Sequence, residues 1–222
     1  MSYFVREIFY SIQGEGYHTG RPAVFCRFAG CNLWSGKETD REEAVCKFCD
    51  TDFAGFDGPE GGVFQTPEEL SARIKESWPA ELAKSSRPFV VLTGGEPLLQ
   101  LDSALISAMH DHGFEIAVET NGTIEPPQGI DWICVSPKAG TRLLLSSGQE
   151  LKLVFPQPGA EPEKYAMLNF RYFFLQPMDS SDSMDLMDLS EREKNTRLCL
   201  EYVLSHPQWR LSLQTQKILG IK

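Results

Sequence analysis

Three of the six cysteines have spacings that could bind a metal centre. Fourteen residues separate Cys31 from Cys46, and two separate Cys46 from Cys49. A Cys-x-x-Cys pair brings two thiolates within reach of one centre, and a third thiolate from a looped-out segment can complete three-point ligation. Three thiolates on a 4Fe-4S cluster leave one iron open to a small molecule. The loop of about 31–49 therefore predicts a cluster that could take part in catalysis.

A structural zinc site is the main alternative for these cysteines. Zinc in such a site normally takes four protein ligands, so a histidine would have to join the three thiolates. The four histidines are scattered along the chain, which favours the cluster. The remaining cysteines, Cys26, Cys134 and Cys199, fall within strand or helix patterns and are expected to be small core residues.

Composition excludes several classes of protein. The net charge is −10, which argues against a nucleic-acid surface because phosphates need clustered lysine and arginine. The apolar runs are too short to span a membrane, and the N-terminal segment does not have the pattern of a signal peptide. We therefore expect a cytoplasmic protein without nucleic-acid or membrane partners, whose cysteines are reduced.

Short apolar runs followed by polar or glycine-rich turns recur along the chain and predict α/β architecture. Helices are expected from Thr66 to about Trp78, from about 101 to 112, from about 161 to 169 and from 190 to 205. About six core parallel strands and an N-terminal strand are expected. A closed eightfold barrel needs about 250 residues, so 222 residues with a long loop predict one domain built as a partial, open parallel barrel. The expected strands are 3–9, 22–28, 89–93, 115–119, 132–135, 151–155, 171–175 and 210–213.

Polar side chains cluster just after the expected strands. In parallel sheets the carboxyl ends of the strands meet at one edge, where ligands bind. The sequence therefore predicts a ligand-binding rim that also carries the cysteine loop. Its members are Thr93 and Glu96, Thr120 and Asn121, Ser136 and Lys138, Gln176 and Asp179, and Gln214 and Thr215. The acidic segment 178–190 is expected to be a loop on that rim.

With these residues in view, the chain resembles the radical S-adenosylmethionine enzymes. Most of that superfamily has three residues between the first two cysteines, whereas this chain has fourteen and keeps only the final spacing. The long gap, together with the motifs F-x-S-I-Q-G-E-G (9–16), C-D-T (49–51), T-G-G-E-P (93–97), E-T-N-G (119–122) and S-P-K (136–138), is similar to the 7-carboxy-7-deazaguanine synthase family. The resemblance covers nearly the whole chain.

The resemblance implies an activity and its cofactors. A 4Fe-4S cluster and S-adenosylmethionine would generate a carbon radical that takes a hydrogen atom from 6-carboxy-5,6,7,8-tetrahydropterin. Ring contraction with loss of ammonia would then give 7-carboxy-7-deazaguanine, on the route to queuosine. The chain would thus be a lyase that also uses Mg²⁺.

The resemblance also implies roles for individual residues. Cys31, Cys46 and Cys49 would bind the cluster, and Thr51 would place its hydroxyl on Mg²⁺. Arg27 would pair with the substrate carboxylate, in a two-point geometry that lysine cannot match. The other pterin-binding candidates are Ile12, Gln13, Gly14, Glu15 and Thr93. The S-adenosylmethionine candidates are Phe48, Cys49, Asp50, Gly95, Glu96, Ser136, Pro137, Lys138, Gln176, Pro177, Met178 and Asp179. Gln214, Thr215 and Lys217 would close the pocket.

The implied partners are the pterin, an electron donor such as a flavodoxin or ferredoxin, and a second copy of the chain in a homodimer. Two other functions stay open at this point. The chain could be a different radical enzyme, such as an activase that makes a glycyl radical on a partner protein, or a non-catalytic metal-binding module. Cleavage of S-adenosylmethionine by the reduced, reconstituted protein would exclude the metal-binding module. Conversion of carboxytetrahydropterin would separate the synthase from other radical enzymes.

Overall fold

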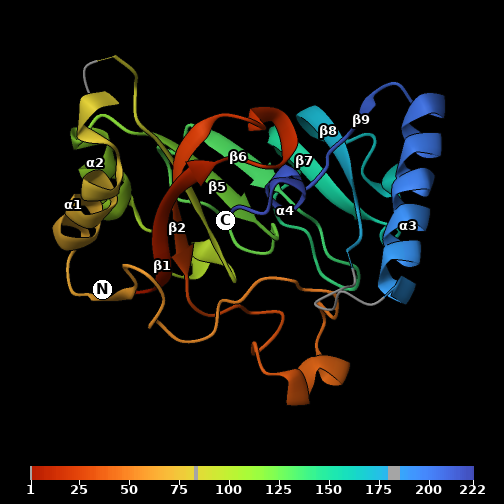
Figure 1. The fold of residues 1–222 in the computed structure, drawn as a ribbon, viewed down its shortest axis with the longest axis horizontal. Coiled ribbons are helices and arrows are strands. Elements are labelled where there is room, and N and C mark those ends of the chain that lie inside the picture. The colour runs from red at the N-terminus through yellow and green to blue at the C-terminus, as the bar shows by residue number, and fades with distance from the viewer. Residues whose placement is uncertain (1, 83–84, 180–185) are drawn as a thin grey trace.

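A computed structural model describes residues 2–82, 85–179 and 186–222. In this part of the chain nine strands form one open sheet, in the order β3-β1-β2-β4-β5-β6-β7-β8-β9. The sheet curves around a central space and its two edge strands do not pair (Figure 1). The strands are β1 Tyr3–Ile12, β2 Pro22–Phe28, β3 Gly62–Phe64, β4 Phe89–Gly94, β5 Glu115–Thr120, β6 Trp132–Val135, β7 Ser147–Phe155, β8 Asn169–Pro177 and β9 Trp209–Leu211.

Strand direction divides the sheet into two parts. Along the order β2-β4-β5-β6-β7-β8-β9 each strand pairs parallel with its neighbour. The strand β1 pairs antiparallel with β2 and β3. This confirms the predicted open α/β barrel, with a parallel run slightly longer than the six strands expected. Because the parallel strands run the same way, their carboxyl ends share one rim.

Three long helices cover the outer face of the sheet. They are α1 Pro67–Ser77, α2 Ser103–Asp111 and α3 Leu186–Ser205, with α1 and α2 at one side of the sheet and α3 at the other (Figure 1). α1 begins as predicted, because the Thr66 hydroxyl accepts a hydrogen bond from Glu69 N at 3.2 Å. The main core, including Leu92, Ile116 and Leu153, is buried among this outer layer. The inner face is therefore left for the site.

The structure differs from the sequence-based expectation in several elements. The helix expected at about 161–169 is only a 3₁₀ turn, Pro162–Lys164, because Asn169 already belongs to β8. β7 begins four residues earlier than expected, at Ser147, and α3 begins at Leu186. The short strand β3 and the short helix α4, Thr215–Leu219, were not predicted. Of the expected loop 178–190, residues 180–185 lie outside the described residues.

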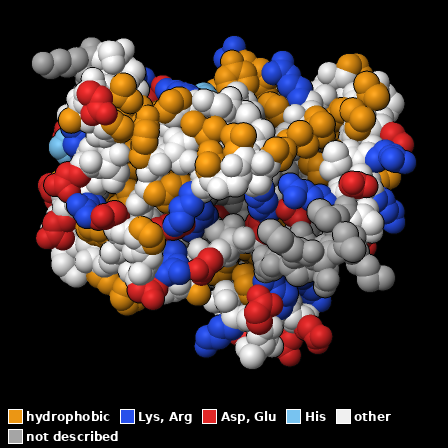
Figure 2. Space-filling model, in the orientation of Figure 1, with side chains coloured by type: hydrophobic (Ala, Val, Ile, Leu, Met, Phe, Trp, Pro, Cys, Tyr) orange, Lys and Arg blue, Asp and Glu red, His pale blue; other side chains and the backbone are white. Residues whose placement is uncertain are grey.

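The cysteine loop lies at the rim of the sheet, below the strands in Figure 1. Its inserted tract forms an exposed 3₁₀ helix, Glu38–Glu43, and the tip of the loop shows both acidic and basic side chains on the surface (Figure 2). α4 lies near the centre of the same view. No helix in the described ranges is long and apolar enough to cross a bilayer.

Candidate active site

A cavity of about 440 Å³ lies at the carboxyl ends of the strands. This volume is within the usual range of pockets for small molecules. Polar residues from the predicted rim line it, including Thr93, Asn121, Lys138 and Gln214. The same wall contains Cys31, Cys46 and Cys49, so the cavity joins the cysteine loop to the barrel interior.

The three thiols are free and only partly exposed or buried. A hydrogen bond with the Cys46 thiol lowers the pKa of Cys49 to about 7, and the same contact raises the pKa of Cys46. Leu33 N donates to Cys31 Sγ at 3.4 Å. Among the described residues no three His, Cys, Asp or Glu side chains converge on one ion-binding point. A cluster does not need such convergence, because each thiolate binds a different iron.

The inserted tract supports the turn that carries the last two cysteines. Arg41 Nη1 donates to the carbonyl of Lys47 at 2.9 Å and to that of Cys49 at 3.1 Å. The Arg41 guanidinium lies over the Trp34 ring, which packs edge-on against Phe53. The tract therefore helps to hold this turn, although most of its side chains are exposed. An arginine inside a charged run gave no signal for this role in the sequence.

The turn after β4 brings the main chain close to the start of the cysteine loop. Glu96 N donates to Gly30 O at 2.9 Å, and a Cβ at Gly95 would stand 2.0 Å from that oxygen. Only glycine fits there. The Glu96 carboxylate is buried behind the cavity wall and accepts from Leu98 N, Thr120 Oγ1 and Asn121 N. Burial raises the pKa of Glu96. Gly95 lines the cavity, while the Glu96 carboxylate organises the turn behind it.

One end of the cavity contains most of the candidates for S-adenosylmethionine. Lys138 Nζ donates to Ser136 O and Oγ at 2.8 and 2.7 Å, and lies 6.0 Å from the centre of the Phe48 ring. Phe48, Ser136 and Lys138 line the cavity together with Cys49, Asp50, Gln176, Pro177 and Asp179. Pro137 and Met178 belong to the same turns but lie outside the cavity wall.

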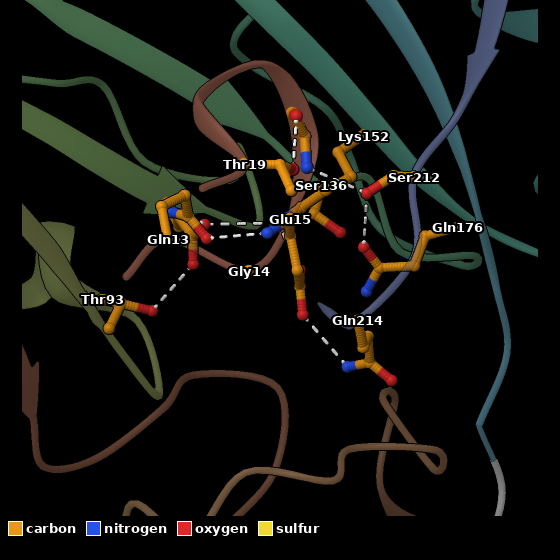
Figure 3. Close-up of polar contacts among 12 residues, drawn as sticks. Gln13, Gly14, Glu15, Thr19, Thr93, Ser136, Lys152, Gln176, Ser212 and Gln214 are labelled. Carbon is orange, nitrogen blue, oxygen red and sulfur yellow. Dashed lines mark hydrogen bonds and ion pairs between the residues drawn. The ribbon is translucent and has the colours of Figure 1, made fainter. Parts of the chain in front are cut away.

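The other end contains a network of buried charges. Lys152 Nζ lies 2.5 Å from Glu15 Oε2 and 3.2 Å from Glu119 Oε1. Burial alone would raise the pKa of Glu15, but the attraction of Lys152 outweighs it and lowers that pKa to about 2. Glu15 also accepts from Gln214 Nε2, and Figure 3 shows these side chains converging between the strands. Glu15 and Glu119 thus place acceptor oxygens on the cavity wall.

The candidate pterin residues meet at this end. Glu119 accepts from Gln13 Nε2 and from Thr93 Oγ1, each at 3.2 Å. The cavity wall includes Ile12, Gln13, Gly14, Glu15, Arg27 and Thr93. Arg27 faces the cavity and Cys26 faces the core, as strand alternation predicts, and Arg27 Nε donates to Glu7 Oε1 at 3.0 Å.

Several lining residues at this end were not predicted from the sequence, among them Glu119, Lys152 and Gln216. Lys152 could have been identified as a site residue from the sequence, because it is a lysine within an otherwise apolar strand that should be buried on both faces. Glu119 lies in the E-T-N-G motif, but only the positions after it were placed on the rim. Gln216 had no local signal. Gln214 and Lys217, which were expected to close the pocket, do line it, whereas Thr215 binds Gly14 O at its edge.

Comparisons with known proteins agree with this geometry. No protein-family model matches the chain. The 7-carboxy-7-deazaguanine synthases of Caulobacter vibrioides and Bradyrhizobium diazoefficiens are 58% and 57% identical to it, and each alignment covers all of both chains. The chain belongs to the 7-carboxy-7-deazaguanine synthase family. The crystal structure of QueE from Escherichia coli superposes with a TM-score of 0.68 at 29% identity, over 96% of this chain and 94% of that one. The synthase family is therefore supported by both sequence and fold.

The donor set fits the cofactors of this radical enzyme family. The free thiols of Cys31, Cys46 and Cys49 stand on the wall of one cavity, and the Cys49 thiol with its lowered pKa ionises readily. These three cysteines would hold a 4Fe-4S cluster and would leave one of its irons without a protein ligand. The adjoining main chain at Gly95 and the polar groups of Ser136 and Gln176 suit an amino acid and a nucleoside, which are the two parts of S-adenosylmethionine.

Proposed function

We propose that this protein converts 6-carboxy-5,6,7,8-tetrahydropterin to 7-carboxy-7-deazaguanine with loss of ammonia. The observation that carries the proposal is that one cavity wall contains the thiols of Cys31, Cys46 and Cys49 together with acidic side chains and the guanidinium of Arg27. A pterin offers several N–H donors and this substrate also has a carboxylate. The thiols thus suit a radical-forming cofactor, and the charged groups suit a carboxylated pterin.

The residues of the chain would bind and orient the substrate. When bound, the cluster and S-adenosylmethionine supply hydrogen-atom abstraction. Glu15 and Glu119 accept N–H groups of the pterin, and the attraction of Lys152 lowers the pKa of Glu15 to about 2, which keeps Glu15 an acceptor. Arg27 binds the substrate carboxylate in place of, or alongside, Glu7. The aromatic and aliphatic wall at Phe9, Phe25 and Ile12 excludes water from the ring.

Mg²⁺ has a candidate ligand in Thr51. Thr51 lies two residues after Cys49 and lines the cavity between the two ends. Magnesium takes oxygen ligands and keeps several waters, so one hydroxyl together with substrate oxygens suits it. We therefore place Mg²⁺ beside Thr51, with Asp50 able to orient its waters.

We also infer the assembly in which this chain works. One domain, 1–222, would bind both cofactors and the substrate, with the expanded loop of about 31–49 holding the cluster. A small redox protein such as a flavodoxin or ferredoxin would donate the electron, and two copies would form a homodimer. Sedimentation of the purified protein and reduction by a candidate donor test these two points.

An anaerobic assay tests the main proposal. Reconstituted protein is mixed with S-adenosylmethionine, dithionite, Mg²⁺ and carboxytetrahydropterin, and the products are separated by chromatography with mass detection. We expect 7-carboxy-7-deazaguanine and ammonia in equal amounts. A Cys49→Ser variant is the matched control for cluster-dependent turnover. Cleavage of S-adenosylmethionine without conversion of the pterin would contradict the proposed substrate and favour another radical enzyme, such as an activase.

A further inference from the structure

The short helix α4 contacts three segments that line the cavity. Thr215 N and Oγ1 donate to Gly14 O at 3.0 and 2.8 Å, which places the start of α4 against the loop after β1. Gln216 Nε2 donates to Glu15 Oε1 at 2.9 Å. A Cβ on Gly14 would stand 2.9 Å from Gln216 N, so the two backbones are closely packed. α4 is therefore firmly anchored at the substrate end of the cavity.

The next residue of α4 contacts two segments that contain candidates for binding S-adenosylmethionine. Lys217 Nζ lies 2.6 Å from Asp50 Oδ2 and 3.0 Å from Asp179 Oδ2. Asp50 directly follows the cluster ligand Cys49, and Asp179 ends the stretch after β8 that lines the cavity. One ammonium thus joins two segments that have no covalent connection near the site.

The charges of Lys217, Asp50 and Asp179 explain why this contact should fix the positions of the two segments. Both carboxylates contact the same ammonium, so Lys217 offsets the repulsion between them. Arg192 Nε also lies 4.0 Å from Asp179 Oδ2, so Asp179 has a second cation beside it. The Asp179 side chain is only 6% exposed, and the Lys217 side chain is 32% exposed. Hydrogen bonds between ionised groups are stronger than neutral ones, and partial burial limits their screening by salt. Gln214 Nε2 also donates to Asp50 Oδ2, at 3.1 Å, but an amide does not neutralise the carboxylate.

We propose that Lys217 is a positioning residue that holds the cluster loop against the carboxyl end of β8 and so shapes the S-adenosylmethionine end of the cavity. This inference rests on the proposed function, because that function places the cofactor between these two segments. Lys217 acts through Asp50 and Asp179, and α4 provides the fixed base from which it does so.

Cofactor binding to the reconstituted protein tests the inference without turnover. We expect Lys217→Met to weaken S-adenosylmethionine binding about tenfold, which corresponds to ~1.4 kcal/mol. The electron paramagnetic resonance spectrum of the reduced cluster should keep its form without S-adenosylmethionine and change less than in wild type when it is added. Lys217→Arg retains the charge and should recover most of the affinity. Lys164→Met is the matched control, because Lys164 pairs with Glu161 on the surface.

A double-mutant cycle separates positioning from direct contact with the cofactor. If Lys217 acts through Asp50, the losses in Lys217→Met and Asp50→Asn should add to clearly more than the loss in the double variant. Fully additive losses, or wild-type affinity and spectrum in Lys217→Met, would overturn the proposal. Iron content reports whether each variant keeps its cluster. If Lys217→Met loses iron, Lys217→Gln takes its place in the cycle.

Failure of the positioning role of Lys217 can be told apart from failure of the proposed function. Wild-type protein that binds S-adenosylmethionine but leaves the pterin unconverted contradicts the substrate, and the Lys217 measurements still stand. Pterin conversion by wild type with unchanged cofactor affinity in Lys217→Met contradicts only the positioning role.

Discussion

The ammonium of Lys152 lies 2.5 Å from the carboxylate of Glu15, inside the barrel and 137 residues away in the chain. The Lys152 side chain is 7% exposed and that of Glu15 is 14% exposed, so water screens this pair weakly. The ordinary pKa of Glu15 would be 4.5, and in the folded protein it is about 2. The pair therefore contributes stability above the unfolded pKa, which is lost as the pH falls toward about 2.

Lys152→Gln should make pterin binding dependent on pH. Without the ammonium, burial is the largest influence on the pKa of Glu15 and raises it, while the hydrogen bonds from Gln214 and Gln216 oppose that rise. Glu15 would then take up a proton as the pH falls, and it would stop accepting one N–H of the pterin. We expect the affinity for the pterin to fall roughly tenfold between about pH 8 and about pH 6, as one pKa unit of differential interaction implies.

Binding of the pterin to the S-adenosylmethionine-free protein, measured at several pH values, checks this expectation. Wild type should show little dependence over the same range, because the pKa of Glu15 lies far below it. Lys164→Gln, at a surface ion pair, serves as the control. A pH profile of Lys152→Gln that matches wild type would remove Glu15 from pterin recognition.

Arg27→Ala should weaken binding of the substrate far more than binding of the cofactor. Arg27 pairs with Glu7 at 3.0 Å on the cavity wall, and a carboxylated pterin would use its remaining donors. Loss of a charged hydrogen bond costs about 1.5–3 kcal/mol, so KM for the pterin should rise at least tenfold. Arg27→Lys should recover only part of this loss, because lysine cannot form a two-point contact.

Steady-state kinetics with each ligand varied in turn measure the Arg27 effect. Arg73→Ala is a suitable control, since Arg73 pairs with Glu76 on the exposed face of α1. An equal increase in KM for the pterin and for S-adenosylmethionine would argue that Arg27 shapes the whole cavity and does not recognise the carboxylate.

Gly95→Ala should reduce cluster incorporation. The new Cβ would stand 2.0 Å from Gly30 O and 2.9 Å from Cys31 Cβ, so the start of the cysteine loop must move. We expect iron content after reconstitution to fall by at least half, because only glycine permits the close approach of these two backbones. In Gly148→Ala, at the opposite end of β7 from the rim, the Cβ would stand 3.0 Å from Phe170 Cε1 and 3.3 Å from Ile133 O, and iron content should stay near that of wild type. Equal iron content in the two variants would contradict the expectation.

Thr51→Val should change the response to Mg²⁺. The substitution keeps the shape of the side chain and removes the hydroxyl that would bind the cation. We expect the Mg²⁺ concentration for half-maximal turnover to rise several-fold. This is the change in binding constant that corresponds to losing one interaction of about 1 kcal/mol, the size of a typical hydrogen bond. Titration of chelator-treated enzyme with Mg²⁺ measures it, and cofactor affinity should be unchanged. An unaltered Mg²⁺ titration would take Thr51 out of the cation site.

The sequence alone determined the parts of this protein that depend on local patterns. The cysteine spacing, the apolar strands followed by polar turns, and the Thr66 cap are short-range features, and they predicted the cluster loop, the parallel rim and the start of α1. The helix expected at about 161–169 failed because pairing of β8 with β7 starts at Asn169 and outweighs local helix propensity.

Only the tertiary structure decided which distant charges meet. Glu15, Glu119 and Lys152 come together because β5 and β7 curve around the loop after β1, and Lys217 reaches Asp50 and Asp179 because α4 folds back over the cavity. No local pattern encodes such contacts. Strand order and curvature set the partners, so Lys152 stands beside Glu15 and lowers its pKa only when the whole sheet has formed.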